Sequence, residues 1–415
     1  RNHKTTDDAS VSTSSHYANP KATDRPRVGF LCAGDPLDPE FFSGTLFNMY
    51  HALADAGADV HPIGRDAVKQ TKLKRLKRKI MFKLKGKGVN WTSGQAGNQA
   101  RAIAKDMAAL TPDVVFAPVA SGLIGRWTYD DVPVVHASDA TPKLLFGYYD
   151  RYSGPDAMKR FEASDTDERL AIAKAAATVV SSDWARDSVI ADYGAAPESV
   201  HVVPLGANVK GALTPDEVQA RPTEGALHLL FIGAAWERKG GAFALEAAKT
   251  LHERGLDVVL HLVGSRPPGN EALPDYVVDE GWCDKRDPAD AAKLDGLLRK
   301  CHVFVLPTRA DCTPVSINEA HAYGMPAVAT DTGGVGSVLE AGVTGALVPL
   351  EADGKAWADA IGELWTDRAA YSAMARAAQQ RYATALSWPA WGRTTAAVLR
   401  GVAKVRESHA AVPRG

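Results

Sequence analysis

Residues 303–330 read VFVLPTRADCTPVSINEAHAYGMPAVAT. The apolar run that ends at Pro307 predicts a buried strand, residues 315–324 have the apolar spacing of a helix, and a second apolar run follows. A strand, a helix and another strand in direct succession indicate a parallel sheet, because parallel neighbours need a crossover between them. An α/β fold is therefore expected around this segment.

The same alternation of apolar runs and amphipathic stretches extends through most of the chain, from residue 27 onward. A stretch rich in Pro, Gly and charge near 206–226 interrupts the pattern, which then restarts. This repetition predicts two Rossmann-like, doubly wound domains whose ligand sites face each other across an interdomain cleft. The expected divisions are a disordered tail at 1–26, an N-terminal domain at 27–206, a C-terminal domain at 207–386, and a C-terminal helix packing back across the domains, with a tail, at 387–415.

Composition argues against several classes of function. The 415 residues carry a formal net charge of −1, which does not favour general nucleic-acid binding. No run of about 18 apolar residues predicts a membrane span, and the polar N-terminus lacks the apolar core of a secretion signal. The four cysteines, Cys32, Cys283, Cys301 and Cys312, lack metal-ligand spacing and are expected to be reduced thiols. A cytoplasmic protein is therefore expected.

Two carboxylates flank the strand-to-helix turn of the opening segment. Asp311 lies in the loop after the strand, where a doubly wound sheet presents ligand-binding groups, and Glu319 lies on the following helix. The first amides of that helix, at Val315, Ser316 and Ile317, are donors without intrahelical partners. Together these groups could bind a polyhydroxylated molecule that bears phosphate. A helix cap and an ordinary surface Glu would explain the same spacing equally well.

A second strand-to-helix turn reads FIGAAWERKGG, residues 231–241. Arg238 and Lys239 lie at the start of its helix, where the helix dipole favours anions and not cations. Solvated surface charge is the commoner reason for such a pair, but the position after a sheet strand favours pyrophosphate binding. In the N-terminal half, Ser43 and Gly44 open a helix as a phosphate-facing turn, which alone is a weak signal.

The strand VPVVHASDATP, residues 132–142, ends in polar residues. Strand alternation places His136 and Asp139 on opposite faces, and Asp139 is nearer the carboxyl end. His136 is interpreted first as a core histidine, and Asp139 as the residue that reaches a cleft. Asp165 and Asp167 resemble the DxD of metal-dependent sugar transferases, but we interpret them as helix-capping residues and expect no metal site.

Residues 69–88 carry ten basic residues and no acid. The apolar spacing predicts a basic amphipathic helix, which could bind the anionic inner face of a membrane. An acidic acceptor or a nucleic acid, or a helix that packs its leucines on the domain and solvates its charges, would explain the run as well. The candidate membrane or acceptor residues are Lys72, Lys74, Arg75, Lys77, Arg78 and Lys79.

In this order the motifs resemble the retaining glycosyltransferases of family 4, which have the GT-B fold, over about residues 27 to 400. The resemblance is most specific in FIGAAWERKGG, in residues 303–334 and in AGVTGALVP. It implies an N-terminal acceptor domain, a C-terminal donor domain, and transfer of a sugar from a UDP- or GDP-linked donor without a metal or other cofactor. The acceptor is not identified, and a membrane lipid or a polysaccharide is among the expected ones.

The resemblance also implies roles for the C-terminal motifs. Glu319 would bind the nucleotide ribose, and Asp311, which is one methylene shorter than the usual Glu, would face the donor sugar. Lys239 matches the lysine that binds the diphosphate. The family's arginine position holds Ala234 here, and Arg238 is the candidate replacement.

For the N-terminal half, the resemblance assigns Gly44 to a turn that approaches the diphosphate. Many relatives place a His at the end of the strand after Pro133, but here that position holds Asp139 and His136 comes three residues too early. Asp139 is therefore the first candidate and His136 the second. Trp282, in EGWCDK, would lie near the nucleotide base.

Other classes of function share these features. A sugar-nucleotide epimerase or a phosphorylase of the same fold would have the same two domains. A non-catalytic scaffold on a membrane surface would explain the basic run but not the paired motifs of the C-terminal half.

Overall fold

The computed structural model describes residues 25–68, 93–149, 155–269 and 272–410. The first half forms the N-terminal lobe around a six-stranded parallel sheet with the order β2-β1-β3-β4-β5-β6. Its strands are β1 Arg27–Leu31, β2 Asp59–Ile63, β3 Val114–Pro118, β4 Val134–Ser138, β5 Ala177–Val180 and β6 Val200–Val202. Its helices are η2 Phe41–Gly44, α1 Thr45–Asp55, α2 Arg65–Val68, α4 Ser93–Leu110, α5 Ser121–Ile124, α6 Pro142–Leu145, α7 Pro155–Lys174, α8 Asp183–Ala191 and η4 Pro197–Ser199.

The second half forms the C-terminal lobe around another six-stranded parallel sheet, with the order β12-β11-β10-β7-β8-β9. Its strands are β7 Leu227–Gly233, β8 Val258–Gly264, β9 Val277–Gly281, β10 Val303–Leu306, β11 Ala327–Thr330 and β12 Gly345–Val348. Its helices are α9 Pro215–Gln219, α10 Trp236–Lys239, α11 Gly241–Glu253, α12 Pro288–Lys300, α13 Val315–Ala322, α14 Val335–Val338, α15 Gly354–Thr366 and α16 Arg368–Arg381, followed by the π-helical turn η5 Tyr382–Leu386. Two doubly wound sheets confirm the predicted fold class.

Apolar side chains fill both faces of each sheet, which explains why the strands are apolar throughout. In the C-terminal lobe, one core cluster includes Phe304 and Ile317, and the other includes Phe231 and Trp357. In the N-terminal lobe, Phe30 and Leu31, adjacent in β1, belong to clusters on opposite faces of the sheet. The strands are therefore held from both sides, and the loops at their carboxyl ends are left to form the site.

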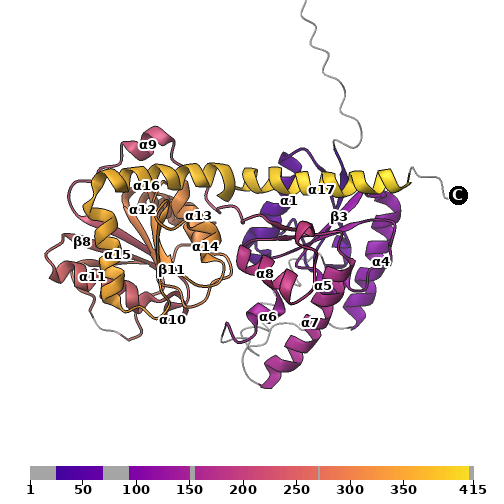
Figure 1. The fold of residues 1–415 in the computed structure, drawn as a ribbon, viewed down its shortest axis with the longest axis horizontal. Helices are drawn as coiled ribbons and strands as arrows, with labels where there is room; N and C mark the ends of the chain where they lie inside the picture. Colours follow the sequence, from indigo (N-terminus) through magenta and orange to yellow (C-terminus); the bar gives the residue numbers. More distant parts are fainter. Residues whose placement is uncertain (1–24, 69–92, 150–154, 270–271, 411–415) are drawn as a thin grey trace, which may run out of the picture.

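A long C-terminal helix, α17 Trp388–Ala410, connects the lobes. In Figure 1, α16 lies over the C-terminal lobe, and α17 continues in nearly the same direction over the N-terminal lobe. Trp391 and Leu399 of α17 belong to the N-terminal core. Gly392 allows the close approach to α1, because a Cβ there would lie 2.2 Å from the carbonyl oxygen of Ala52. The last helix is thus part of the N-terminal lobe's packing.

Buried histidines in the C-terminal lobe predict a loss of stability in mild acid. Burial lowers the pKa of His302 and of His321 from 6.5 to about 4. Below pH 6.5 the unfolded chain takes up protons that the folded protein does not, so stability present above pH 6.5 is lost as the pH falls towards 4. We expect the midpoint of urea unfolding to decrease across this window and to decrease less in His302→Asn. The exposed His51→Asn is the control, and a midpoint that is constant across the window would contradict this prediction.

Candidate functional site

Lys239 and Asp311 meet at the carboxyl ends of two neighbouring strands of the C-terminal sheet. Lys239 ends α10, which follows β7, and Asp311 follows β10. The Lys239 Nζ and the Asp311 Oδ2 are 2.5 Å apart, and both side chains are largely buried. Gly240 makes this approach possible, because its φ is +72° and a Cβ there would lie 1.8 Å from the carbonyl oxygen of Pro307. The structure thus joins two residues predicted separately from the sequence.

Arg238 contacts the same loop. Its Nη1 donates a hydrogen bond of 2.9 Å to the carbonyl oxygen of Ala310. Its own carbonyl oxygen accepts hydrogen bonds from the amide of Arg309 and the hydroxyl of Thr308. The guanidinium also lies 5.6 Å from the centre of the Tyr149 ring. Arg238 is therefore next to the Lys239–Asp311 pair and holds the backbone that carries Asp311.

Glu319 lies on α13 and is 3% exposed. Its carboxylate forms an ion pair with the ammonium group of Lys285, whose side chain is much more exposed. A buried carboxylate needs such a partner, since an isolated charge is costly to bury. Sequence reasoning missed Lys285, although it belongs to the EGWCDK loop that was singled out for Trp282.

The first turn of α13 only partly matches the prediction of three unpaired amides. The N-cap residue is Pro314, and no side chain caps this helix end. The amide of Ile317, however, donates a hydrogen bond of 3.0 Å to the carbonyl oxygen of Pro314. The prediction was therefore wrong for Ile317, because the turn closes one residue earlier than an ideal α-helix. Val315 and Ser316 stay candidates for binding an anion.

Gly44 and Trp282 line one large cavity between the lobes. The cavity has a volume of about 1020 Å³ and includes Lys285. On the N-terminal side, Phe42, Ser43 and Gly44 have consecutive positive φ angles of 52°, 55° and 79°. This left-handed turn precedes α1, and Ser43 and Gly44 of the turn line the cavity. An ion pair of 3.2 Å between Glu40 and Arg286 joins the two sides of the cavity.

Asp139 and His136 occupy different environments in the N-terminal lobe. Asp139 follows β4 and lines a narrower pocket together with Phe42 and Ser181. His136 is fully buried, with its Nε2 3.2 Å from the Ser121 Oγ and 3.8 Å from a Glu168 carboxylate oxygen. His136 is therefore a core residue that lines neither the large cavity nor the narrower pocket, whereas Asp139 lines the narrower pocket.

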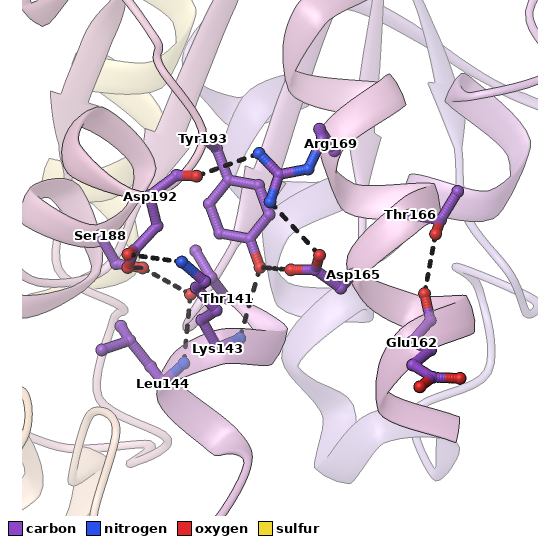
Figure 2. A network of polar contacts seen from close by, with 10 residues as sticks. All are labelled: Thr141, Lys143, Leu144, Glu162, Asp165, Thr166, Arg169, Ser188, Asp192 and Tyr193. Carbon is purple, nitrogen blue, oxygen red and sulfur yellow. Dashed lines mark hydrogen bonds and ion pairs between the residues drawn. The ribbon is translucent and has the colours of Figure 1, made fainter. Parts of the chain in front are cut away.

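The Asp165–Asp167 pair lies inside α7 and does not cap a helix, so the capping interpretation was wrong. Figure 2 shows Asp165 between Tyr193 and Arg169, at 2.7 Å from the Tyr193 hydroxyl and 3.3 Å from an Arg169 nitrogen. Asp167 pairs with Arg126. The acidic stretch resembles a helix start only because α7 is exposed and polar over much of its length. Among the described residues, no group of three or more His, Cys, Asp or Glu side chains could hold a metal.

Two predictions concern residues outside the described ranges. These are the basic run at 69–88, with its six candidate residues, and nearly all of the N-terminal tail at 1–26. In the part of the chain that the structure describes, no helix is long and apolar enough to cross a membrane.

Two doubly wound lobes, with candidate ligand residues from both around one interlobe cavity, define the GT-B class of proteins. Solved structures agree with this architecture. Sucrose-phosphate synthase from Thermosynechococcus elongatus covers 93% of this chain and 100% of its own, with a TM-score of 0.61 and 17% identity. Anabaena HepE in complex with UDP-glucose covers 92% and 100%, with a TM-score of 0.58 and 15% identity. At these identities the likeness concerns the fold.

Two family models match the chain, one in each lobe. The model described as Glycosyltransferase Family 4 matches residues 45–210, and the model described as glycosyl transferases group 1 matches residues 226–367. The chain belongs to this family of GT-B glycosyltransferases, which confirms the resemblance of the motifs.

Curated relatives include two named D-inositol 3-phosphate glycosyltransferases. The protein of Paenarthrobacter aurescens is 28% identical over 281 residues, which are 65% of this chain and 66% of the relative. The protein of Catenulispora acidiphila is 33% identical over 236 residues, which are 53% of this chain and 56% of the relative. The matched regions therefore span slightly less than two thirds of the first relative and over half of the second.

Proposed function

We propose that the protein transfers a sugar from a nucleoside diphosphate sugar to an acceptor hydroxyl, with retention at the anomeric carbon. The observation that carries this proposal is the pair of Lys239 and Asp311 together with the buried Glu319, all on loops and helices that follow strands of one parallel sheet. Such a group combines a cation for a diphosphate with carboxylates that accept hydrogen bonds from hydroxyls. UDP- and GDP-linked sugars both present these chemical features.

Each charged group has a proposed partner in the donor. Lys239 binds the diphosphate, and Asp311, which it contacts in the free protein, accepts a hydrogen bond from a hydroxyl of the donor sugar. Glu319 exchanges part of its contact with Lys285 for the ribose hydroxyls. The uncapped start of α13, at Val315 and Ser316, offers amide donors to anionic oxygens.

The remaining candidates extend this site into the large cavity and the N-terminal lobe. Trp282, which is 65% exposed, offers an aromatic face for the nucleotide base. Gly44 lines the same cavity from the other lobe and lets a diphosphate approach the backbone. Asp139 is proposed to face the transferred sugar at the carboxyl end of β4.

Catalysis in this proposal depends on positioning and on charge. As the bond from the anomeric carbon to the diphosphate breaks, negative charge develops on the leaving group, and Lys239 stabilises it. The acceptor hydroxyl attacks from the face that the diphosphate leaves and gives its proton to the departing diphosphate oxygen, which preserves the configuration. Holding acceptor and donor together supplies much of the rate, so no strong protein nucleophile is needed.

Chelation is expected to leave activity intact. Because Lys239, Arg238 and backbone amides supply positive charge to the diphosphate, excess EDTA should not reduce the initial rate of transfer. The rate is measured by mass spectrometry of the product, in parallel with an EDTA-treated sample to which Mg²⁺ or Mn²⁺ is returned. Complete loss in EDTA that either ion restores would contradict a metal-independent mechanism.

D-inositol 3-phosphate is the acceptor that we propose to test first, since the curated relatives carry that activity in their names. Removing the phosphate removes charge-assisted hydrogen bonds, so kcat/KM for transfer to myo-inositol should be about tenfold lower than for transfer to D-inositol 3-phosphate. A lipid-linked acceptor in anionic vesicles is the second arm, because the basic run at 69–88 predicts membrane binding. Equal rates with inositol and its phosphate, or transfer to the lipid alone, would contradict this acceptor.

A further inference from the structure

Two consecutive tyrosines of the N-terminal lobe contact the loop that carries Asp311. Tyr148 and Tyr149 follow α6, and their hydroxyl oxygens accept hydrogen bonds from the amides of Asp311, at 3.0 Å, and of Cys312, at 3.1 Å. The Tyr148 hydroxyl is also 3.0 Å from the Thr332 hydroxyl, and the Tyr149 hydroxyl donates to the Cys312 thiol at 3.3 Å. Both aromatic side chains thus reach from one lobe into the other.

The two amides are at the place where a donor sugar would bind. They belong to the strand-to-helix loop between β10 and α13, and Asp311 is also the partner of Lys239. A hydroxyl or an anionic oxygen of a bound donor could accept hydrogen bonds from these N–H groups. A phenol oxygen that already accepts them occupies the position that such an oxygen would take.

We propose that Tyr148 and Tyr149 form a latch that fills the donor-sugar subsite in the free protein, and that a nucleotide sugar binds by displacing it. The inference rests on the proposed function, because it takes the loop at Asp311 as the sugar subsite. The base of the donor, proposed to lie at Trp282, does not compete with the latch, since the cavity with Gly44 and Trp282 does not include either tyrosine.

The C-terminal lobe is shaped to accept Tyr148. Gly333 has a φ of +54°, and a Cβ there would lie 2.4 Å from the Tyr148 hydroxyl oxygen and 2.2 Å from the carbonyl oxygen of Asp311. At Gly334, a Cβ would lie 1.8 Å from the carbonyl oxygen of Cys312. Only glycine therefore allows this turn to lie against both the loop and the tyrosine.

Other contacts hold the lobes together at the same edge. The hydroxyls of Ser181 and Thr313 are 2.5 Å apart. The amide of Asp183 donates to the Ser337 hydroxyl at 2.8 Å, and this hydroxyl donates to the Asp183 carboxylate at 3.0 Å. The latch is thus part of a closed interface between the lobes, and its release would open the cleft at the sugar end.

The latch also touches the cation next to Lys239. The guanidinium of Arg238 lies over the Tyr149 ring, 5.6 Å from its centre, which adds a cation–π contact to the latch. Burial raises the pKa of Tyr148 and of Tyr149, so both phenols stay neutral and can donate and accept near neutral pH.

The test combines Tyr148→Phe with Tyr149→Phe, which removes both acceptor oxygens and keeps both rings. The donor is whichever of UDP-glucose, UDP-N-acetylglucosamine and GDP-mannose stabilises the wild-type protein most against heat. Loss of two competing hydrogen bonds should tighten its binding by about tenfold in calorimetry, whereas binding of the free UDP or GDP should change by less than about twofold. Tyr50→Phe is the matched control, because it loses one hydroxyl bond, to the carbonyl oxygen of Val60, away from this interface.

Hydrogen exchange tests the latch without any ligand. In the free double variant, the amides of Asp311 and Cys312 should exchange faster than in the wild type and in Tyr50→Phe. Unchanged exchange at these two amides, or weaker binding of the nucleotide sugar in the double variant, would overturn the latch. If exchange rises as expected while no nucleotide binds to any variant, the latch stands as an interlobe contact and the proposed function fails.

Discussion

Lys239→Met is expected to reduce kcat/KM for sugar transfer by at least about 100-fold, because it removes the cation that stabilises the departing diphosphate. The lysine is 2.5 Å from Asp311 and is largely buried, so solvent does not replace it easily. Lys249→Met is the control for the loss of one positive charge, since Lys249 is exposed on the neighbouring helix α11 and pairs only weakly with Glu253.

Removing Lys239 alone also leaves Asp311 without its partner, which can destabilise the protein. The double variant Lys239→Met/Asp311→Asn removes both charges and keeps the shape of the pair. We expect its thermal unfolding to be near that of the wild type while its activity stays at least about 100-fold lower. A double variant that recovers activity would mean that Lys239 acts only as a structural partner of Asp311.

Glu319→Gln is expected to weaken donor binding by about 10- to 100-fold, because the ribose loses hydrogen bonds to a charged acceptor. The affinity for the free nucleoside diphosphate should fall by the same factor as the affinity for the nucleotide sugar, since both contain the ribose. Calorimetry with each ligand measures this ratio. Glu363→Gln, on the exposed side of α15, is the control.

A different outcome would reassign Glu319. Its carboxylate is buried and paired with Lys285, so a purely structural role would lower the melting temperature and leave nucleotide affinity unchanged. Loss of affinity for the sugar but not for the nucleotide would place Glu319 at the sugar subsite instead.

The sequence was most informative where chemistry and chain order coincide. Residues 303–330 form a strand, a loop and a helix as expected, so the places of Asp311 and Glu319 on the loop and the helix followed from the apolar pattern. That Lys239 meets Asp311 was not predicted by that pattern. Their contact depends on β7 and β10 being neighbours in the sheet, although β8 and β9 separate them along the chain.

The contacts that sequence reasoning missed arise from tertiary structure. Lys285 reaches Glu319 from a loop 34 residues earlier, and nothing local in EGWCDK marks it as a partner. Tyr148 and Tyr149 form hydrogen bonds with residues of the other lobe that lie 163 positions later in the chain. Aromatic residues in a loop have no periodicity, so their roles depend on how the lobes face each other.

The errors have a local cause. Asp165 was predicted to cap a helix because acidic residues are common at helix starts, yet α7 already begins at Pro155, and Asp165 contacts Arg169 and Tyr193 from within it. Ile317 appeared unpaired because an ideal α-helix leaves its first amides free, yet the turn at Pro314 closes on it. In both cases the outcome depends on where the helix begins and how its first turn closes, which the local pattern does not determine.

The most direct test measures sugar transfer from UDP-glucose, UDP-N-acetylglucosamine and GDP-mannose to D-inositol 3-phosphate by mass spectrometry, in the wild type and in Lys239→Met/Asp311→Asn. We predict that one donor yields glycosylated acceptor and nucleoside diphosphate in equal amounts, only when acceptor is present, and that the double variant forms almost none. Conversion of a donor sugar without acceptor, or equal product from the double variant, would contradict a glycosyltransferase whose donor site is built on Lys239 and Asp311.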